Sequence, residues 1–208
     1  MAKQFDFMGL TLRAKLTYLA HLVKGVTKQH HVWMKFLLRK FIDKDSIILD
    51  IGGHSGQYAK LFARLAPQGK VYSFEPGCSP RSIFKLSVRF NRLHNVEVVS
   101  KGLGAEPGML SLVTPLKENG VFRFGLAHLG TKENCISAET EEVTVTSIDM
   151  FAVDYGLQGL DFIKIDVEGW EAQILKGGSK TIRRYCPTLL VELVANQLSR
   201  TGDDLETI

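Results

Sequence analysis

The chain has 208 residues, 45% of them hydrophobic and 23% charged, a composition typical of a soluble globular protein with one core. Its formal net charge of +4 is too small to indicate a nucleic-acid partner, and none is expected. The sequence shows neither the roughly 18 uninterrupted apolar residues of a membrane span nor a signal peptide, and its 3 scattered cysteines indicate reduced thiols, so we expect a cytoplasmic protein without stable membrane insertion.

Two amphipathic helices are predicted at the start of the chain. Apolar residues recur at helical spacing over 10–26 and again over 30–42, with basic residues on the other faces of the first helix. A basic amphipathic helix can lie on a membrane surface. Packing on a sheet is the commoner role and the one we favour, so residues 1–44 are expected to form an N-terminal helical extension.

The stretch 46–56 has the pattern of a strand, a glycine turn and the start of a helix. An apolar run over 47–51 is typical of a strand buried on both faces, and the turn reads D-x-G-G-x-x-G. A helix is predicted over 57–66. This construction lets the backbone approach a nucleotide closely, although a glycine turn without a ligand is the simpler alternative.

Asp50 is the unusual residue of this turn, because a carboxylate inside an apolar run is costly to bury without partners. Dehydrogenase fingerprints keep that position apolar and space their glycines as G-x-G-x-x-G, which disfavours a dehydrogenase. An acidic residue here suits a ligand that brings a cation, such as the ammonium and sulfonium of S-adenosylmethionine, or turn N–H groups that need an acceptor.

A second strand is predicted over 70–74 and ends at Glu75-Pro76. An acid at this place, about 20 residues past the glycines, can accept both hydroxyls of a ribose; the alternative is a surface carboxylate before a proline. A helix over 79–93 and a strand over 95–100 follow. The alternation of strands and helices predicts an α/β fold with a doubly wound, mostly parallel sheet.

The alternation then stops. Residues 108–114 alternate in polarity, as do 142–147, and the two segments are expected to pair as antiparallel strands. The long stretch between them contains several glycines and apolar residues, and loops of this length are usually functional. We therefore expect a lid-like insertion over 108–147.

A further buried strand is predicted within 160–167, and it ends at Asp166-Val167-Glu168-Gly169. In open α/β sheets ligands bind at the carboxyl ends of the strands, so Asp166 and Glu168 are expected beside the glycine turn. They could act as a base with an orienting partner, or as two metal ligands. Acids that favour the next helix, over 170–175, would explain Glu168 equally well, but this alternative does not explain Lys164 inside a buried strand.

These segments resemble the signature segments of FkbM-type methyltransferases. The matching runs are Ile48–Gly53, Val71–Pro76, Thr146–Asp149, Ile163–Gly169, Leu175–Gly178 and Pro187–Glu192. The resemblance implies a class I, Rossmann-like methyltransferase domain over 45–208 that uses S-adenosylmethionine to methylate a hydroxyl of a sugar or other small metabolite. The residues expected to bind the cofactor are Asp50, Gly52, Gly53, His54, Gly56, Glu75, Pro76 and Gly102.

Two features depart from this family pattern. His54 stands where the family usually has a small amide, and only five core strands are identified where a class I sheet has seven. The chain is therefore expected to lack the last strands, with a helix beginning near 202. A truncated cofactor-binding remnant without activity is the alternative function.

The expected chemistry is an in-line methyl transfer, in which a base removes the proton of the acceptor hydroxyl. We assign that role to Asp166, or to Lys164 if burial leaves it neutral, with Glu168 orienting the acceptor alone or through a divalent ion; a metal is possible but not predicted. The alternative is a buried pair of Lys164 and Asp166 that only shapes the end of the strand. The acceptor and the oligomeric state are not indicated by the sequence.

Overall fold

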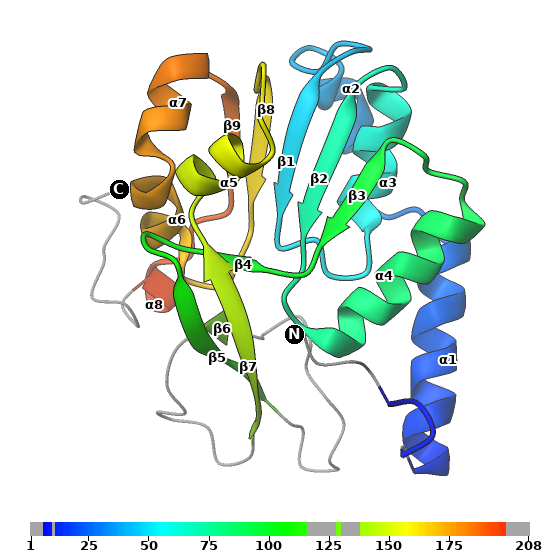
Figure 1. Ribbon diagram of the computed structural model, residues 1–208. Helices are drawn as coiled ribbons and strands as arrows, with labels where there is room; N and C mark the ends of the chain where they lie inside the picture. The colour runs from blue at the N-terminus through cyan, green and yellow to red at the C-terminus, as the bar shows by residue number, and fades with distance from the viewer. Residues whose placement is uncertain (1–5, 10, 116–127, 130–137, 199–208) are drawn as a thin grey trace.

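A computed structural model describes residues 6–9, 11–115, 128–129 and 138–198 of the chain (Figure 1). The helices are α1 (Leu12–Thr27), α2 (Met34–Leu38), α3 (Gln57–Leu65), α4 (Cys78–Phe90), α5 (Ile148–Asp154), α6 (Glu171–Gly177), α7 (Ser179–Tyr185) and α8 (Ala195–Leu198). The strands are β1 (Ile47–Ile51), β2 (Lys70–Phe74), β3 (Val96–Val99), β4 (Gly102–Leu103), β5 (Gly108–Pro115), β6 (His128–Leu129), β7 (Ala138–Thr146), β8 (Phe162–Ile165) and β9 (Thr188–Val191).

The main sheet has five strands among the described residues, in the order β3-β2-β1-β8-β9, and every neighbouring pair is parallel. The chain leaves β1 toward β2 and β3 on one side and returns to β8 and β9 on the other. This is a doubly wound arrangement, and the point where the order reverses lies between β1 and β8. The predicted fold class is confirmed, and the predicted strands of this main sheet lie within one residue or two of the observed ones.

Each face of the main sheet carries its own core, because alternate residues of a strand point to opposite faces. On one face, Ile48 of β1 and Phe162 of β8 pack with α2, α3 and α4. On the other face, Leu49 and Ile163 pack with α5, α6 and α7. The uninterrupted apolar runs of the sequence reflect this burial on both sides.

The two leading helices differ from their prediction. α1 has nearly the predicted bounds, but it lies outside α4 rather than on the sheet (Figure 1): the Tyr18 hydroxyl is 2.8 Å from the Ser82 hydroxyl, and a Cβ at Gly25 would lie 3.2 Å from Ile83 Cγ2. The helix predicted over 30–42 is wrong at both ends, since α2 covers only Met34–Leu38. His31 precedes it with a positive φ of 57°, which a continuous helix does not allow.

The predicted antiparallel pair is confirmed as β5 and β7, which belong to a second sheet of order β4-β7-β5-β6. This small sheet lies beyond the carboxyl ends of β1, β2 and β3 (Figure 1). It is linked to the start of α4 by the Cys78 amide, which donates to Glu141 Oε2 at 3.0 Å. The lid expected between the strands falls mostly on 116–127 and 130–137, outside the described residues.

Three of the described helices were not predicted, α5, α7 and α8. The signal for α5 was present, because Ser147 caps it by accepting a hydrogen bond from the Met150 amide at 3.1 Å. α4 begins one residue before the predicted Ser79-Pro80 start, with Gly77 as its N-cap residue. The helix expected near residue 202 lies outside the described part of the chain.

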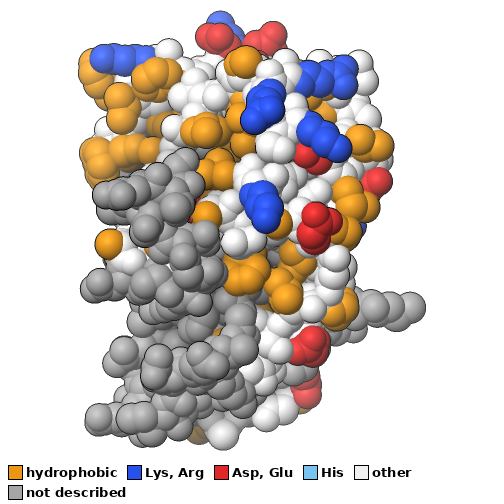
Figure 2. Space-filling view, turned by 90° about the vertical axis from the view of Figure 1, so that its left-hand side faces the viewer, with side chains coloured by type: hydrophobic (Ala, Val, Ile, Leu, Met, Phe, Trp, Pro, Cys, Tyr) orange, Lys and Arg blue, Asp and Glu red, His pale blue; other side chains and the backbone are white. Residues whose placement is uncertain are grey.

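β9 forms one edge of the main sheet within the described residues. Figure 2 shows this side of the molecule, where hydrophobic and basic side chains are interspersed. Leu189, Leu193 and Val194 are exposed here, each near 40%.

Gly52, at the end of β1, is required by the protein backbone itself. Its φ is +81°, and a Cβ on it would lie 1.9 Å from the carbonyl oxygen of Asp166. A side chain at this position would therefore push the ends of β1 and β8 apart before it met any ligand.

Alanine at Gly52 should therefore destabilise the fold itself, by roughly 2–4 kcal/mol in the free energy of unfolding. Two matched glycines separate the causes. Gly156 also has a positive φ, of 58°, but has nothing within 4 Å of an added Cβ, so Gly156→Ala should cost about 1 kcal/mol. Gly108→Ala, with open space and no positive φ, should change stability by less than about 0.5 kcal/mol. Denaturant unfolding measures all three, and an unchanged midpoint for Gly52→Ala would contradict the steric account.

Candidate active site at the carboxyl ends of β1, β2 and β8

The candidate site is built on three strands that are in register. Asp50 of β1 lies opposite Ser73 of β2 on one side and opposite Lys164 of β8 on the other. All three side chains point to the sheet face that α3 covers, since each lies two residues after a core residue of that face, Ile48, Val71 or Phe162. The sequence therefore brings a carboxylate, a hydroxyl and an ammonium together one step before the strands end.

Asp50 is completely buried, and its two oxygens have unequal surroundings. Oδ2 accepts a hydrogen bond from the Ser73 hydroxyl at 2.7 Å. Oδ1 lies 3.7 Å from Lys164 Nζ and is a buried oxygen without a hydrogen-bond partner. Burial raises the pKa of Asp50, and the neighbouring Lys164 charge opposes that rise.

Lys164 is also buried, and its ammonium joins β1 to β8. Nζ is 3.1 Å from the Gly52 carbonyl oxygen, 3.4 Å from that of Ile51 and 3.1 Å from Asp166 Oδ2. It also lies 5.0 Å from the ring centroid of Tyr58 on α3. The carbonyl and carboxylate oxygens around Nζ accept hydrogen bonds, and the ring face attracts cations, so the surroundings of Lys164 suit a hydrogen-bond donor on every side.

Asp166 follows β8 and is the accessible carboxylate of this group, with 32% of its side chain exposed. Glu192, which follows the neighbouring strand β9, is also exposed, and the charge of Asp166 followed by burial raises the pKa of Glu192. Glu192 was not among the predicted site residues. The same carboxyl-end rule would have found it, because Val191 pairs with Ile165 across the two strands.

Glu75 lies at the end of β2, as predicted, but it is buried and its oxygens already accept backbone hydrogen bonds. Oε2 accepts from the His54 amide and Oε1 from the Gly77 amide, each at 2.8 Å. Burial raises the pKa of Glu75 to about 7, because the hydrogen bonds and the charge of Arg81 offset only part of the desolvation. Each oxygen keeps a further lone pair for a ligand hydroxyl.

His54 joins the turn after β1 to Glu75 through its backbone, with a positive φ of 46°. Burial, followed by the charges of His21 and Lys164, lowers the pKa of the His54 imidazole. The side chain is therefore neutral at physiological pH. The hydrogen bond to Glu75 comes from the backbone, so it does not depend on whether a histidine or a small amide stands at this position.

Glu168 and Glu171 have different roles in the loop between β8 and α6. Glu171 Oε1 accepts from the Val167 amide at 3.3 Å and from the Gly169 amide at 3.1 Å, so Glu171 is the buried acid that holds the loop. Glu168 instead has a left-handed φ of 58°, which is uncommon for a residue other than glycine. Its unusual backbone places it outside the regular start of α6 and is compatible with a role toward a ligand.

The other predicted cofactor-binding residues lie around the same turn or beyond it. A Cβ at Gly53 would lie 2.3 Å from Ser73 Oγ, and one at Gly56 would lie 2.3 Å from Phe84 Cδ2, so packing requires both glycines. Pro76 follows Glu75, and its carbonyl accepts a hydrogen bond from Arg81. Gly102 begins β4 and pairs with β7, at the junction with the small sheet.

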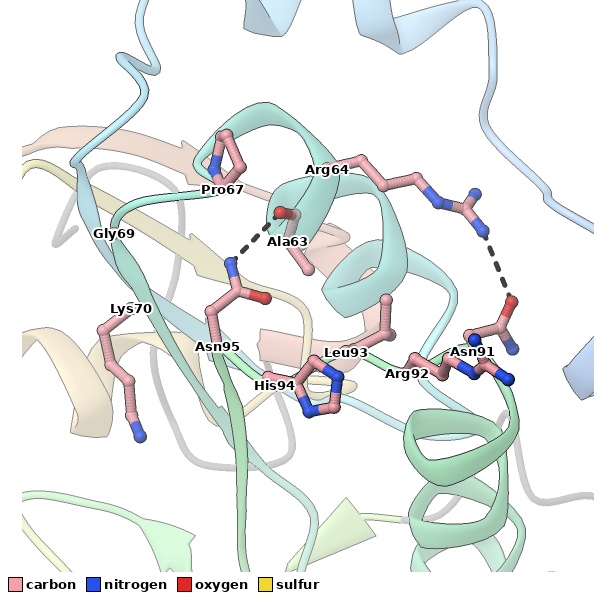
Figure 3. Close-up of a pocket in the computed structure, with 10 residues that line it drawn as sticks. All are labelled: Ala63, Arg64, Pro67, Gly69, Lys70, Asn91, Arg92, Leu93, His94 and Asn95. Carbon is pink, nitrogen blue, oxygen red and sulfur yellow. Dashed lines mark hydrogen bonds between the residues drawn. The ribbon is translucent and has the colours of Figure 1, made fainter.

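A surface hollow lies at the opposite, amino-terminal end of the strands (Figure 3). Arg64, Lys70, Arg92 and His94 are among its lining residues, and Asn95 donates to the Ala63 carbonyl at 3.1 Å. None of the carboxylates described above lies in it, so we do not assign the site there. No group of three or more potential metal ligands occurs among the residues that the structure describes.

A parallel α/β sheet whose glycine turn and acidic residues meet where the strand order reverses defines a nucleotide-cofactor-binding class of protein. Residues 50–207 match the family described as the methyltransferase FkbM domain. That match covers most of the chain, so the chain belongs to the FkbM methyltransferase family, and the predicted resemblance is confirmed.

Two curated relatives give the scale of the similarity. Methyltransferase 1 of Beauveria bassiana is 29% identical over 161 residues, which are 66% of this chain and 64% of the relative. The 2-O-methyltransferase NoeI of Sinorhizobium fredii is 26% identical over 153 residues, which are 67% of this chain and 60% of the relative. The chain thus spans less than two thirds of the length of these relatives.

Solved structures of methyltransferases are similar at lower identity. A precorrin-6y C5,15-methyltransferase from Geobacter metallireducens has a TM-score of 0.48 at 14% identity, and covers 86% of this chain and 69% of its own. An O-methyltransferase from Bacillus cereus, solved in complex with SAH, has a TM-score of 0.40 at 15% identity, over 79% of this chain and 59% of its own.

The residues at the strand ends fit the cofactor that a methyltransferase family implies, S-adenosylmethionine. Its ammonium needs an acceptor, and Asp50 Oδ1 is a buried oxygen that lacks a donor. Its ribose needs two acceptors side by side, which the carboxylate of Glu75 offers. Asp50 and Glu75 thus present carboxyl oxygens that are neutral or negatively charged, as a positively charged ligand requires.

Glu75 should make cofactor binding depend on pH. Ribose hydroxyls donate to the ionised carboxylate, whereas a pKa of about 7 leaves Glu75 mostly protonated at pH 6. Binding should therefore lower this pKa and release a proton, and the affinity for S-adenosylhomocysteine should rise about tenfold from pH 6 to pH 8. Calorimetric titration in two buffers of different ionisation enthalpy measures both quantities.

The matched controls for this pH dependence are two glutamate substitutions. Glu75→Gln should bind more weakly and lose the pH dependence. Glu97→Gln, which removes a surface carboxylate 3.1 Å from Lys70 Nζ, should keep it. An unchanged pH dependence in Glu75→Gln would show that another group is responsible.

Proposed function

We propose that this protein is an S-adenosylmethionine-dependent methyltransferase that transfers the methyl group to a hydroxyl of a sugar or other small metabolite. Membership of the FkbM family supports methyl transfer. The name of the S. fredii relative, a 2-O-methyltransferase, supports an oxygen acceptor. The single observation that carries the proposal is the half-exposed Asp166, which a buried ammonium holds beside the glycine turn.

Asp166 is the group that we assign as the base. When bound, the cofactor supplies an electrophilic methyl group on its sulfonium. The acceptor hydroxyl then has to lose its proton, and an ionised carboxylate with 32% of its side chain exposed can receive it. The ion pair with Lys164 Nζ, at 3.1 Å, fixes Asp166 in position.

Lys164 is better suited to positioning than to proton abstraction. A base needs a lone pair directed at the substrate, but Nζ is buried and surrounded by two carbonyl oxygens and two carboxylates. A nitrogen enclosed by acceptors donates to them and presents no lone pair to a substrate. We therefore retain Asp166 as the base and Lys164 as the residue that positions it.

Glu192 is a second carboxylate for the same proton. The charge of Asp166, followed by burial, raises the pKa of Glu192, so the two carboxylates lie close enough to influence each other. This arrangement can receive the proton of the acceptor and pass it to solvent, since Glu192 is exposed. Glu168, with its left-handed backbone, remains the candidate for orienting the acceptor.

The test is Asp166→Asn, which keeps the shape and removes the charge. Methyl transfer from labelled S-adenosylmethionine to the small-molecule fraction of a cell extract should fall by about 10²–10⁴-fold, because a positioned base contributes that much. Calorimetric binding of S-adenosylhomocysteine should stay within about threefold of the wild type, since Asp166 is not assigned to the cofactor. Asp154→Asn, an exposed carboxylate of α5, is the matched control and should leave both unchanged.

Three outcomes have distinct meanings. Activity that survives Asp166→Asn makes Asp166 a structural residue and the base assignment wrong. A wild type that binds S-adenosylhomocysteine but transfers no methyl group favours the remnant without turnover. Inhibition of the wild type by a chelator would indicate that Glu168 and Asp166 bind a divalent ion instead.

A further inference from the structure

The first 42 residues have a charge unlike that of the rest of the chain. They contain eight of the 26 Lys and Arg residues but one of the 22 Asp and Glu residues, a net charge of +7. The remainder of the chain is at −3, so the overall +4 conceals two oppositely charged parts. No acidic residue occurs between Phe7 and Ile42, the stretch that contains α1 and α2.

α1 carries an apolar stripe that the fold leaves exposed. Leu12, Leu16, Leu19 and Val23 follow the i, i+4, i+7, i+11 spacing of one helix side, and their exposed fractions are 76%, 61%, 44% and 60%. Buried leucines would be expected if this side were the contact with the domain. Many of the apolar residues whose spacing predicted the helix therefore lie on the protein surface and not in the core.

The attachment of α1 to the domain uses a different side and the end of the helix. Lys60 is buried and donates to the carbonyl oxygens of Gly25 at 2.6 Å and Lys28 at 2.5 Å. Ser87 and Asn91 of the α4 region donate to the carbonyls of Gly25 and Val26. These contacts satisfy the carboxyl-terminal carbonyls of α1 and fix its position without the stripe.

Lysines border the stripe on both sides. Successive residues of an α-helix are 100° apart, so Lys15 lies to one side of Leu16 and Lys24 to the opposite side of Val23. Lys24 is exposed and Lys15 half-buried over the ring of Phe7. An apolar stripe with a cation on each side is typical of a helix that lies in a lipid interface, with its leucines among the acyl chains and its ammonium groups at the headgroups.

We propose that α1 docks the protein on the surface of a membrane that contains anionic lipids. Charge complementarity selects this occupant, because a net charge of +7 attracts acidic headgroups at roughly 1 kcal/mol for each nearby cation, about a fivefold change in binding. A second copy of the chain would place the lysines of one α1 against those of the other, which is repulsive. The docking is peripheral: no helix in the described part of the chain is long and apolar enough to cross a bilayer.

The test is vesicle flotation with the full chain. Vesicles of phosphatidylcholine with about one third phosphatidylglycerol should carry the protein, and pure phosphatidylcholine vesicles should not. Leu16→Glu should lower the partition coefficient at least tenfold, since it puts a charge into the stripe. Val153→Glu, a matched exposed apolar residue of α5 at 80% exposure, should lower it less than twofold.

The contribution of the basic residues is tested by the same flotation assay, which compares Lys24→Gln with Lys180→Gln. Lys180 is an exposed lysine of α7. The first should weaken binding to anionic vesicles about fivefold and the second hardly at all. Circular dichroism confirms that each variant is folded. Failure of the wild type to bind anionic vesicles, equal binding of Leu16→Glu, or a lipid-free dimer that Leu16→Glu dissociates would each overturn the proposal.

Discussion

The buried ammonium of Lys164 is the interaction on which the candidate site depends. It joins the carbonyls at the end of β1 to the carboxylate after β8, and it is the cation beside the buried Asp50. A buried ion pair is weak evidence of stability, but removing one partner leaves the other charge uncompensated, at a cost of about 3–5 kcal/mol. Lys164 therefore holds the two strand ends together and supplies the cation that faces both carboxylates.

This arrangement explains the close approach of the two strand ends. The Gly52 carbonyl accepts from Lys164, its Cα faces the Asp166 carbonyl, and the Asp166 amide donates to the Ile51 carbonyl at 3.2 Å. The turn after β1 also reaches β2, since the amides of Gly52 and Gly53 both donate to the Phe74 carbonyl. Three strands thus end in one hydrogen-bonded unit, and the acids of the site project from it.

Much of the fold was predictable because burial on both faces leaves a plain signal. The apolar runs that form β1, β2 and β8 predicted the parallel sheet. The glycine turn after the first run predicted where the strand order reverses. The helix over 30–42 was overpredicted, because apolar periodicity does not reveal a local left-handed residue such as His31. Periodicity also does not reveal what covers an apolar side, and for this reason the exposed stripe of α1 was assigned to packing.

The site was predictable in its location and less so in its contacts. Lys164 stood out as a charge in an apolar run, and Asp50 for the same reason. The hydrogen bonds from His54 and Gly77 that occupy Glu75 depend on tertiary geometry, which no spacing encodes. Glu192 was missed because its signal, an acid at a strand end, becomes meaningful only when β9 is known to neighbour β8.

The position of the cofactor is tested most directly by a crystal structure of the full chain with S-adenosylhomocysteine. The account predicts density across the carboxyl ends of β1 and β2, with both ribose hydroxyls on Glu75 and the amino group on the side of Asp50. Density in the hollow at the amino-terminal ends of the strands, or a ribose held by residues other than Glu75, would contradict it.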